Sequence, residues 1–516
     1  MSASYDVIVV GAGIGGLSAA LHLACEGYRV GVFDGAQVPG GKAGIETLDG
    51  VELDTGPSLF TLTEVLRSLL AKAGRVLEEE VELRRLDPSF RYVFADGVVL
   101  DMGFEAEASL ASVEGTLGPA ARDQFRAFLD YSRELWEAAA PAFVFAPAPS
   151  LSSIRQLGAR KSMQALTRID ALRSMQKAIE SKVRDPYLHR IFLRYATYNG
   201  SDPRRAPATL NCIPHVEFGL GAYGVQGGMY EIVRAIVRAA ESKGVEFHQA
   251  EAVQHLWIEG SVLRGIESAR GRYGASAVVV NAAVEHLFET LMPQRQEAPE
   301  ALEPSMSAWN ALVRVPRRAE RAAHTVCFPA GDYLDEFRDI FDRDLLPADP
   351  TLYVCAPEKA HGRQGWPEEE ALFVMVNAPA TPRQGPGLGA EAIAELREKV
   401  LRSLAKAEGC AQVELLWQRA PKDLAARFPG SRGSIYGGAS NSMFSAFRRP
   451  ANRVKSLSGL YLASGGAHPG GGVPMSMLSG QHAAAALLED RVDPRGQRKS
   501  WLPRVFESAT ANRRRA

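Results

Sequence analysis

Residues 6–16 read Asp-Val-Ile-Val-Val-Gly-Ala-Gly-Ile-Gly-Gly, and this stretch decides the fold. Its apolar run Val7–Val10 predicts a buried parallel strand, and the Ala- and Leu-rich segment Leu17–Cys25 predicts a helix. The turn between them has the spacing G-x-G-x-x-G, with glycines at Gly11, Gly13 and Gly16. The first glycine permits a tight turn, the second lets the backbone approach a pyrophosphate, and the third lets helix and strand pack closely. This order predicts a dinucleotide-binding fold with the phosphates at the helix N-terminus.

The residues after this turn continue the same pattern. A second predicted strand, Tyr28–Phe33, ends on Asp34, which follows Gly16 by 18 residues. In dinucleotide-binding folds, a carboxylate about 20 residues after the turn hydrogen-bonds ribose hydroxyls. A glycine-rich turn in an ordinary doubly wound sheet would explain the glycines but would leave the acid without a role. The pattern therefore favours a dinucleotide site with Asp34 at the ribose.

Two further glycine-containing segments follow. Residues 39–44 read Pro-Gly-Gly-Lys-Ala-Gly, and residues 54–58 read Asp-Thr-Gly-Pro-Ser. The first offers additional backbone amides and a cation to a pyrophosphate. A plain nicotinamide-binding domain would instead proceed to its next strand and helix. The candidate cofactor-binding residues of these two segments are Gly41, Lys42, Gly56, Pro57 and Ser58.

Length, charge and cysteine content limit the number of domains, the kinds of partner and the cellular compartment that we expect. A chain of 516 residues predicts two or three domains. Lys plus Arg number 59 against 60 Asp plus Glu, so no overall field favours nucleic acid as a partner. The five cysteines contain no C-x-x-C pair, which suggests reduced thiols in the cytoplasm, and no metal site is expected. With no room for a signal peptide and no apolar run of about 18 residues, no membrane span is expected.

One region is typical of a membrane contact. Ala138–Pro149 is apolar but too rich in proline for a long helix, so a loop is expected there. Between Arg155 and Arg194, ten Lys or Arg stand against three Asp or Glu, with apolar residues at helical spacing. A basic amphipathic helix beside an apolar loop is typical of a monotopic contact with a membrane surface. The alternative, which the pattern by itself favours, is a surface helix whose apolar face packs on the core.

The rest of the chain alternates predicted helices and strands. Helices are expected at Leu62–Ala73, over most of 105–200, from Tyr230 and at Glu391–Ala407. Antiparallel strands with a turn at Asp96-Gly97 are expected within Val81–Asp101. Further strands are expected at 245–247, 253–258, 275–280, 306–316, 351–356 and 371–379, and the last three predict an antiparallel sheet that forms a wall of the substrate domain. The basic tail from Arg491 is expected to be solvated or to add to the membrane contact.

A second glycine-rich bend lies near the C-terminus. Residues 460–474 read Leu-Tyr-Leu-Ala-Ser-Gly-Gly-Ala-His-Pro-Gly-Gly-Gly-Val-Pro, which predicts a strand that ends in a bend. A helix is expected from Met475 to about Leu488, with Pro474 in a position that favours a helix start. The chain therefore carries two strand, glycine bend and helix units, one near each end.

Together these motifs resemble those of the flavin-containing amine oxidase and phytoene desaturase superfamily, in which the bound cofactor is FAD. The run Arg194–Pro203, the A-P-A at 206–208 and the G-G-M at 227–229 resemble a stretch of the phytoene desaturases. Over nearly its full length the chain is similar to bacterial carotenoid desaturases of the phytoene desaturase type. The bend at 468–474 with Gly433–Gly437 resembles the hydroxycarotenoid 3,4-desaturase branch, and Ala467 stands where phytoene desaturases tend to have threonine.

The resemblance implies roles for individual residues. The counterpart of Val253 contacts the adenine of FAD through its backbone. The bend at 465–474 passes the flavin ring, and the helix after it points its N-terminus at the ring. The implied cofactor-binding residues of this bend are Gly466, Gly472, Val473 and Pro474. His468 would lie near the flavin, where it could accept a proton or equally well fix the loop by hydrogen bonds. Asp202 and Glu217 are further candidates for the base.

The implied fold is α/β. It combines a discontinuous Rossmann-like FAD-binding domain, an antiparallel-sheet substrate domain and a helical region that would contact a membrane. The FAD-binding domain is expected to comprise residues 1–90, 216–290 and 431–490. The helical region and the substrate sheet are expected at 91–215 and 291–430, with a basic tail at 491–516.

The implied activity is FAD-dependent desaturation of an acyclic carotenoid, with 3,4-desaturation of a 1-hydroxycarotenoid as the specific expectation. A hydride would pass to flavin N5 while a proton leaves the adjacent carbon. An apolar tunnel, and not hydrogen bonds, would recognise such a polyene. Oxygen or a membrane quinone would reoxidise the flavin, since no second G-x-G-x-x-G follows a strand. The enzyme would then lie in the cytoplasm, peripherally associated with the inner membrane.

Several alternatives stay open at this point. A phytoene desaturase, a redox-neutral carotenoid isomerase and a carotenoid oxidase would share the scaffold. An amine oxidase is less favoured, because those enzymes often hold flavin through a cysteine near the C-terminal motif, and no cysteine follows Cys410. A protein that binds carotenoid without catalysis would leave the flavin-facing motif without a purpose.

Overall fold

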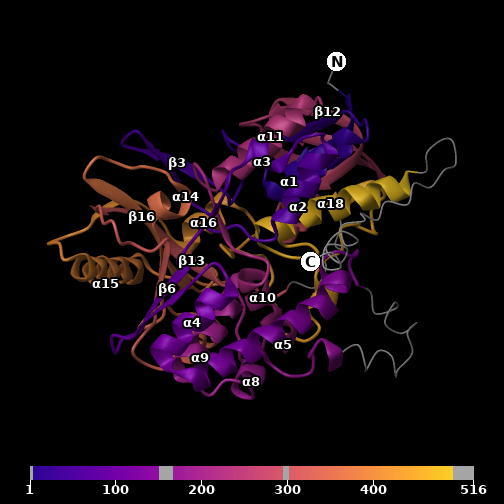
Figure 1. Cartoon of the computed structure of the whole chain (residues 1–516). Helices are drawn as coiled ribbons and strands as arrows, with labels where there is room; N and C mark the ends of the chain where they lie inside the picture. Colours follow the sequence, from indigo (N-terminus) through magenta and orange to yellow (C-terminus); the bar gives the residue numbers. More distant parts are fainter. Residues whose placement is uncertain (1–3, 150–166, 294–301, 492–516) are drawn as a thin grey trace.

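The computed structural model describes residues 4–149, 167–293 and 302–491. Its elements form three groups (Figure 1). A largely parallel sheet with helices on it occupies one side, and a second sheet with its own helix occupies the other. A cluster of helices lies against both. The α/β class, the discontinuous dinucleotide-binding fold and the second sheet are confirmed.

The first sheet is assembled from three stretches of chain that are far apart in sequence. Its central strand β1 (Ser4–Val10) pairs in parallel with β2 (Val30–Phe33) on one side and with β12 (Gly271–Val280) on the other. The strands β9 (Glu246–His248) and β18 (Leu460–Leu462) extend the parallel part beside β2 and β12. The strands β10 (Val253–Glu259) and β11 (Val262–Ser268) continue it antiparallel from β12. The carboxyl ends of β1, β2 and β18 therefore lie at one edge of the sheet.

The helices on this sheet pack through small residues. Helix α1 (Ile14–Cys25) is buried over all but its last residue, and it packs against α11 (Tyr230–Ser242) and α18 (Val473–Asp490). Helix α2 (Thr63–Lys72) adds its apolar face to the same core. A Cβ on Gly480 of α18 would lie 2.2 Å from the carbonyl oxygen of Gly15. The close approach of α1 and α18 therefore requires glycine at position 480.

The second sheet has the order β17-β13-β16-β15-β14-β6-β7. It is antiparallel except where β14 pairs in parallel with β6. The three strands predicted at 306–316, 351–356 and 371–379 pair antiparallel, as expected. Its strands are β6 (Phe90–Val93), β7 (Val99–Met102), β13 (Ser307–Pro316), β14 (His324–Cys327), β15 (Leu352–Cys355), β16 (Glu369–Ala378) and β17 (Glu414–Arg419). Helix α15 (Ala390–Glu408) packs with the apolar residues of one face, which leaves the other face to the interior.

Within Val81–Asp101, only part of the predicted pairing forms. The strands β6 and β7 make the expected antiparallel pair around Asp96-Gly97. The strand β5 (Leu83–Arg85) instead pairs with β8 (Tyr223–Val225), because that partner comes from a part of the chain that local sequence does not specify. The remaining short elements are β3 (Ile45–Leu48), β4 (Val51–Asp54), α3 (Leu77–Glu80), α12 (Val284–His286), η3 (Leu287–Leu291), α13 (Leu334–Asp342), α14 (Pro357–His361), α16 (Pro421–Arg427) and α17 (Ser445–Arg448).

The helical group differs from its prediction in two places. Helix α5 (Pro119–Phe143) continues through Pro141, so the predicted loop from Ala138 is wrong as far as Phe143. A proline in the last turn removes one backbone hydrogen bond, and the buried residues of α5 compensate for this loss. The other members of the group are α4 (Ala106–Leu117), α8 (Met175–Glu180), α9 (Pro186–Arg194), η1 (Tyr195–Asn199), η2 (Ala208–Cys212) and α10 (Ile213–Phe218).

The basic segment 155–194 is not one amphipathic helix in its described part. Residues 155–166 lie outside the described residues. From residue 167 onward the segment is broken into α8 and α9, and Met175 and Ile179 are buried in the core. This favours the reading in which the apolar face packs inward. None of the helices in the described ranges is long and apolar enough to cross a bilayer.

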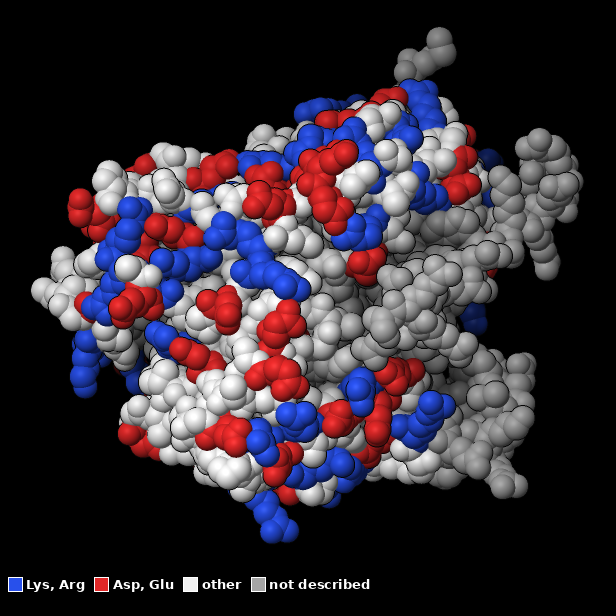
Figure 2. All heavy atoms as spheres, in the orientation of Figure 1, with Lys and Arg blue, Asp and Glu red and all other residues white. Residues whose placement is uncertain are grey.

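The surface reflects the balanced composition. Figure 2 shows acidic and basic side chains interspersed over the described part of the face that it draws. The five cysteines, which all lie in described ranges, are free thiols.

The packing of α1 against α18 predicts a difference between two glycine substitutions. Gly480→Ala should lower the free energy of unfolding by about 1–3 kcal/mol, because the new methyl group meets backbone atoms of α1. Gly115→Ala in α4 is the control, since nothing lies within 4 Å of its Cβ position, and it should raise stability by up to about 1 kcal/mol. Urea unfolding followed by circular dichroism measures both, and equal stability of Gly480→Ala and wild type would contradict the packing argument.

Candidate active site

One large cavity lies where the two glycine-rich bends meet. Its volume is about 1530 Å³, and its lining includes Gly11 and Gly13 from the first bend and the stretch 464–466 and 469–476 around the second. Both bends follow parallel strands of the first sheet, at the edge where doubly wound folds bind ligands. The cavity exceeds the ~300–1,000 Å³ of a pocket for a single small molecule. It therefore has room for a dinucleotide and a second molecule.

The first bend is shaped by its glycines. Gly11 has φ +98°, and a Cβ on Gly13 would lie 2.5 Å from Oδ1 of Asn281. Gly16 does not line the cavity, and its Cβ would lie 2.1 Å from the carbonyl oxygen of Gly11, so its role is the close packing of helix and strand. Asn281 follows β12 and its side-chain amide donates to the carbonyl of Ala463. Asn281 thus joins the two bends, a role that its position after a predicted strand did not reveal.

Asp34 lies at the end of β2 and lines the cavity. Its Oδ2 accepts a hydrogen bond from the backbone N–H of Ala12 at 2.6 Å, and its Oδ1 accepts one from the N–H of Ala36 at 2.7 Å. The side chain is half-buried, and each carboxylate oxygen has a further lone pair for a ligand donor. Its position matches a carboxylate held ready for a ribose hydroxyl.

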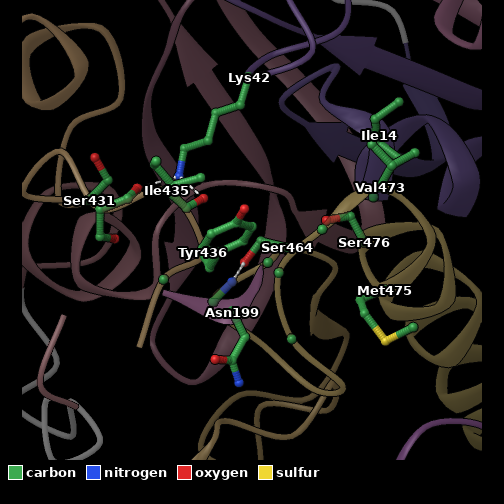
Figure 3. Close-up of a pocket in the computed structure, with 18 of the residues that line it drawn as sticks. Ile14, Lys42, Asn199, Ser431, Ile435, Tyr436, Ser464, Val473, Met475 and Ser476 are labelled. Carbon is green, nitrogen blue, oxygen red and sulfur yellow. Dashed lines mark hydrogen bonds between the residues drawn. The ribbon is translucent and has the colours of Figure 1, made fainter. Parts of the chain in front are cut away.

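The side chain of Lys42 reaches from its glycine segment to the 433–437 segment. Its Nζ donates to the carbonyl oxygens of Ser434 and Ile435 at 2.8 and 3.0 Å (Figure 3). Burial, with a smaller contribution from Arg419, lowers the pKa of the ammonium to about 8. Lys42 thus ties the N-terminal part to the 433–437 segment and faces the cavity there. The other predicted residues of this region that line the cavity are Gly41, Gly56, Pro57, Ser58 and Val253.

The second bend presents a helix N-terminus to the cavity. Gly472, with φ +105°, caps α18, and the first turn of that helix holds no acidic residue. The predicted residues Gly466, Gly472, Val473 and Pro474 all line the cavity. The N-terminus of α1 also faces it without an acidic residue or a side-chain cap. Two positive helix ends therefore converge on one space.

Two residues that fix the second bend were not identified from the sequence. The Cβ position of Gly471 lies 2.7 Å from atoms of Tyr436, which Figure 3 shows beside Ser464 and Asn199. Arg449 donates to the carbonyl oxygens of Gly465 and Gly438 at 3.1 and 2.9 Å. Burial lowers the pKa of its guanidinium to about 10, which still leaves it charged near neutral pH. Arg449 therefore holds the second bend to Gly438, which follows the 433–437 segment, and places a positive charge beside them.

His468 does not face the cavity. The residue is buried, its Nε2 lies 2.9 Å from the carbonyl oxygen of Ala146, and it is absent from the cavity lining. Burial lowers the pKa of His468 to about 4, so the ring is neutral near pH 7. This placement favours the role of fixing the loop over that of a base. Among the further candidates, Asp202 is held by Arg204 outside the lining, whereas Glu217 lines the cavity.

The interior face of the second sheet forms another wall of the cavity. Cross-strand pairs place one row of side chains along this wall, running Arg419, Asn310, Met375, Tyr353 and Val326. Tyr353 OH lies 2.6 Å from Oγ of Ser58, which joins the wall to the 54–58 segment. An apolar arm completes the cavity, lined by Trp136, Ala139, Phe143, Ile169, Leu210, Ile213 and Val216.

These residues fit FAD. The glycine cradle leaves no space for a side chain at Gly13, which suits a backbone that approaches a pyrophosphate. The positive N-terminus of α1 suits the negative charge of the pyrophosphate, and the carboxylate of Asp34 suits the hydroxyls of a ribose. The second helix end and the charge of Arg449 lie at the second bend, where they suit an electron-accepting ring that gains negative charge.

Comparisons with known proteins agree with this arrangement. The model of the family described as flavin containing amine oxidoreductase matches residues 14–488. Hydroxyneurosporene desaturase of Rhodobacter capsulatus is 35% identical, over 95% of this chain and 99% of that protein. The 1-hydroxycarotenoid 3,4-desaturase of a Flavobacterium species is 31% identical, over 92% of this chain and 98% of that protein. An oxidoreductase from Methanosarcina mazei shares the fold, with a TM-score of 0.62 and 16% identity over 94% of this chain and 99% of that one.

The position of Asp34 predicts a defect in cofactor retention. Asp34→Ala should lower FAD affinity by about 10-fold or more, because it removes the ribose acceptor and the anchor of the Ala12 and Ala36 amides. The flavin-to-protein absorbance ratio after dialysis measures this. Asp6→Ala is the control, since Asp6 accepts from the N–H of Arg29 outside the cavity. Equal FAD retention in the two variants would contradict the assignment.

Proposed function

The chain belongs to the flavin containing amine oxidoreductase family, and on this premise we propose that it is an FAD-dependent carotenoid desaturase acting at the 3,4 bond of an acyclic 1-hydroxycarotenoid. The observation that carries the proposal is the shared cavity, in which both glycine bends and an apolar arm meet. The similarity to hydroxyneurosporene and 1-hydroxycarotenoid desaturases supports this choice of substrate. When bound, FAD supplies a two-electron acceptor for a hydride.

The protein's contribution is to hold the polyene and to stabilise negative charge. The apolar arm between α5, η2 and α10 excludes water and aligns a flexible hydrocarbon by shape. The substrate loses a hydride and a proton from adjacent carbons, which leaves a new C=C bond. The α18 N-terminus, Arg449 and Lys42 concentrate positive charge at the second bend and the 433–437 segment, where it favours hydride acceptance.

The amine oxidase alternative is disfavoured by an observation in the cavity wall. An amine substrate would need an aromatic or acidic site for its cation. The guanidinium of Arg194 already fills the aromatic cage formed by Phe90, Tyr92, Tyr195 and Tyr198. Of these rings, Phe90 and Tyr198 line the cavity. The cage therefore offers no place to a second cation, and both oxygens of the nearby Glu217 already accept from tyrosine hydroxyls.

Desaturation predicts a measurable change in the pigment. Purified holoprotein, incubated with liposomes that contain hydroxylycopene, should lengthen the chromophore and shift its absorption to longer wavelength. The reaction is run in air and, anaerobically, with added quinone, which identifies the acceptor. A changed isomer without loss of hydrogen would favour the redox-neutral isomerase instead. No change with any acyclic carotenoid, despite bound FAD, would refute the proposal.

We also infer that the apolar arm meets a membrane surface, from which the substrate enters. Met443 and Phe444 are 44% and 51% exposed, and Met443 also lines the cavity. Phe447 lines the same region and packs against Phe143 of the apolar arm at 6.0 Å between ring centroids. Exposed apolar side chains at the opening of a cavity for a lipid-soluble substrate suit an interfacial contact.

The membrane contact predicts a change in vesicle flotation. Replacement of Met443 and Phe444 by serine should lower co-flotation with anionic vesicles several-fold, because it removes apolar area that would enter the interface. Leu345→Ser is the matched control, since Leu345 is 53% exposed but does not line the cavity. A second variant reverses the charges of Arg168, Arg173 and Lys177, which tests the basic segment separately. Flotation unchanged in both variants would exclude these surfaces.

A further inference from the structure

We propose that Arg194 and Glu217 form a hydroxyl-binding site in the cavity wall, which recognises the oxygen-bearing end of the substrate. The inference rests on the proposed function, and it names the part of the carotenoid that the protein reads by hydrogen bonds. It revises the expectation that an apolar tunnel alone recognises the polyene.

The two charged residues are brought together by three elements. Arg194, the last residue of α9, is 5% exposed, and its guanidinium lies within 4.9–5.3 Å of four ring centroids. Its Nη2 donates to the hydroxyl of Tyr92 at 2.7 Å. Glu217 of α10 is 3% exposed and accepts hydrogen bonds from Tyr195, at 2.6 Å, and from Tyr198. Both Arg194 and Glu217 line the cavity.

The pairing of these charges is incomplete. Nη2 of Arg194 lies 3.9 Å from Oε2 of Glu217, beyond hydrogen-bond distance. Nε of Arg194 has no hydrogen-bond partner among the described residues. A buried guanidinium whose charge is incompletely paired is costly, so an additional acceptor from a ligand that contacts its cavity-facing part would be favourable. A hydroxyl can accept from the guanidinium and donate to the carboxylate at once, whereas a hydrocarbon end can do neither.

The position of Arg194 and Glu217 determines which part of the polyene lies near the predicted cofactor-binding segment 54–58. Tyr353 pairs with Val326, and Val326 pairs with Tyr92. Tyr353 and Tyr92 are therefore two strands apart, roughly 10 Å. Tyr353 is bonded to Ser58, in the segment that follows the first bend. A hydroxyl held by Arg194 would thus keep the end of the chain, and not its middle, close to Ser58, which is one of the predicted cofactor-binding residues.

The ion pair of Arg204 with Asp202 is structural, and it differs from the pair of Arg194 with Glu217. Arg204 donates to both oxygens of Asp202 and also to Asp342, so its charge is fully paired. Arg204 does not line the cavity. Arg194 differs on both counts, which is why a ligand-binding role is assigned to it. Arg204→Met is accordingly a matched control for the loss of a paired arginine.

The test compares two substrates of equal length, hydroxylycopene and lycopene, with the FAD-loaded full-length protein. Wild type should desaturate hydroxylycopene with the higher kcat/KM. Arg194→Met should lower the ratio of the two kcat/KM values by about 10- to 100-fold, chiefly through the hydroxylated substrate. Arg204→Met should leave the ratio unchanged. FAD content and thermal denaturation establish that each variant is folded.

The outcomes separate this inference from the proposed function. If wild type desaturates neither compound, the proposed function fails. If wild type desaturates both equally well, or if Arg194→Met lowers both values by the same factor, the hydroxyl-binding site is refuted while the desaturase function stands. Should Arg194→Met fail to retain FAD, Glu217→Gln and Tyr198→Phe are measured in its place. A lowered ratio in either supports the site, and an unchanged ratio in both refutes it.

Discussion

The structure depends on the close packing of two helices that begin at the two glycine bends. Gly15 of α1 and Gly480 of α18 leave no room for side chains, since a Cβ on Gly15 would lie 2.2 Å from the carbonyl oxygen of Ala463. The strands that precede these helices pair through β12 in one parallel sheet. Because parallel strands end at a common edge, both helix N-termini face the same cavity. Residues more than 450 positions apart thereby form a single site.

Three buried cations give this cavity a positive electrostatic environment. Lys42, Arg419 and Arg449 bond to backbone carbonyl oxygens there and not to carboxylates. Burial lowers the pKa of each of these groups, which means that their charge is held at a cost in free energy. An anionic cofactor offsets that cost, and a group that gains negative charge during reaction does so further. These three cations therefore lower the stability of the protein without its cofactor, and they stabilise the negative charge that develops in the proposed reaction.

The substrate side of the cavity combines apolar and polar recognition. The arm beside α5 offers only shape and hydrophobic contact, which suits any long polyene. Arg194 and Glu217 add polar recognition, because an incompletely paired buried guanidinium distinguishes an oxygen from a methyl group. In the proposed enzyme, the arm would supply affinity and the polar pair would set which end of the substrate lies near the reacting segment.

Local sequence by itself determined the elements of the site and their order. Strand, glycine turn and helix were readable near both ends, because glycine spacing and apolar periodicity reflect short-range geometry. Tertiary structure decided where the longer side chains lie. Lys42 contacts Ser434 and Ile435, and His468 contacts Ala146, more than 300 residues away in each case. Arg194 of α9 bonds to Tyr92 of β6 and lies 3.9 Å from Glu217 of α10, so three separate elements bring these side chains together. Such contacts depend on distant partners that no local pattern encodes, and for this reason the sequence predicted the bends while the structure alone placed the charges around them.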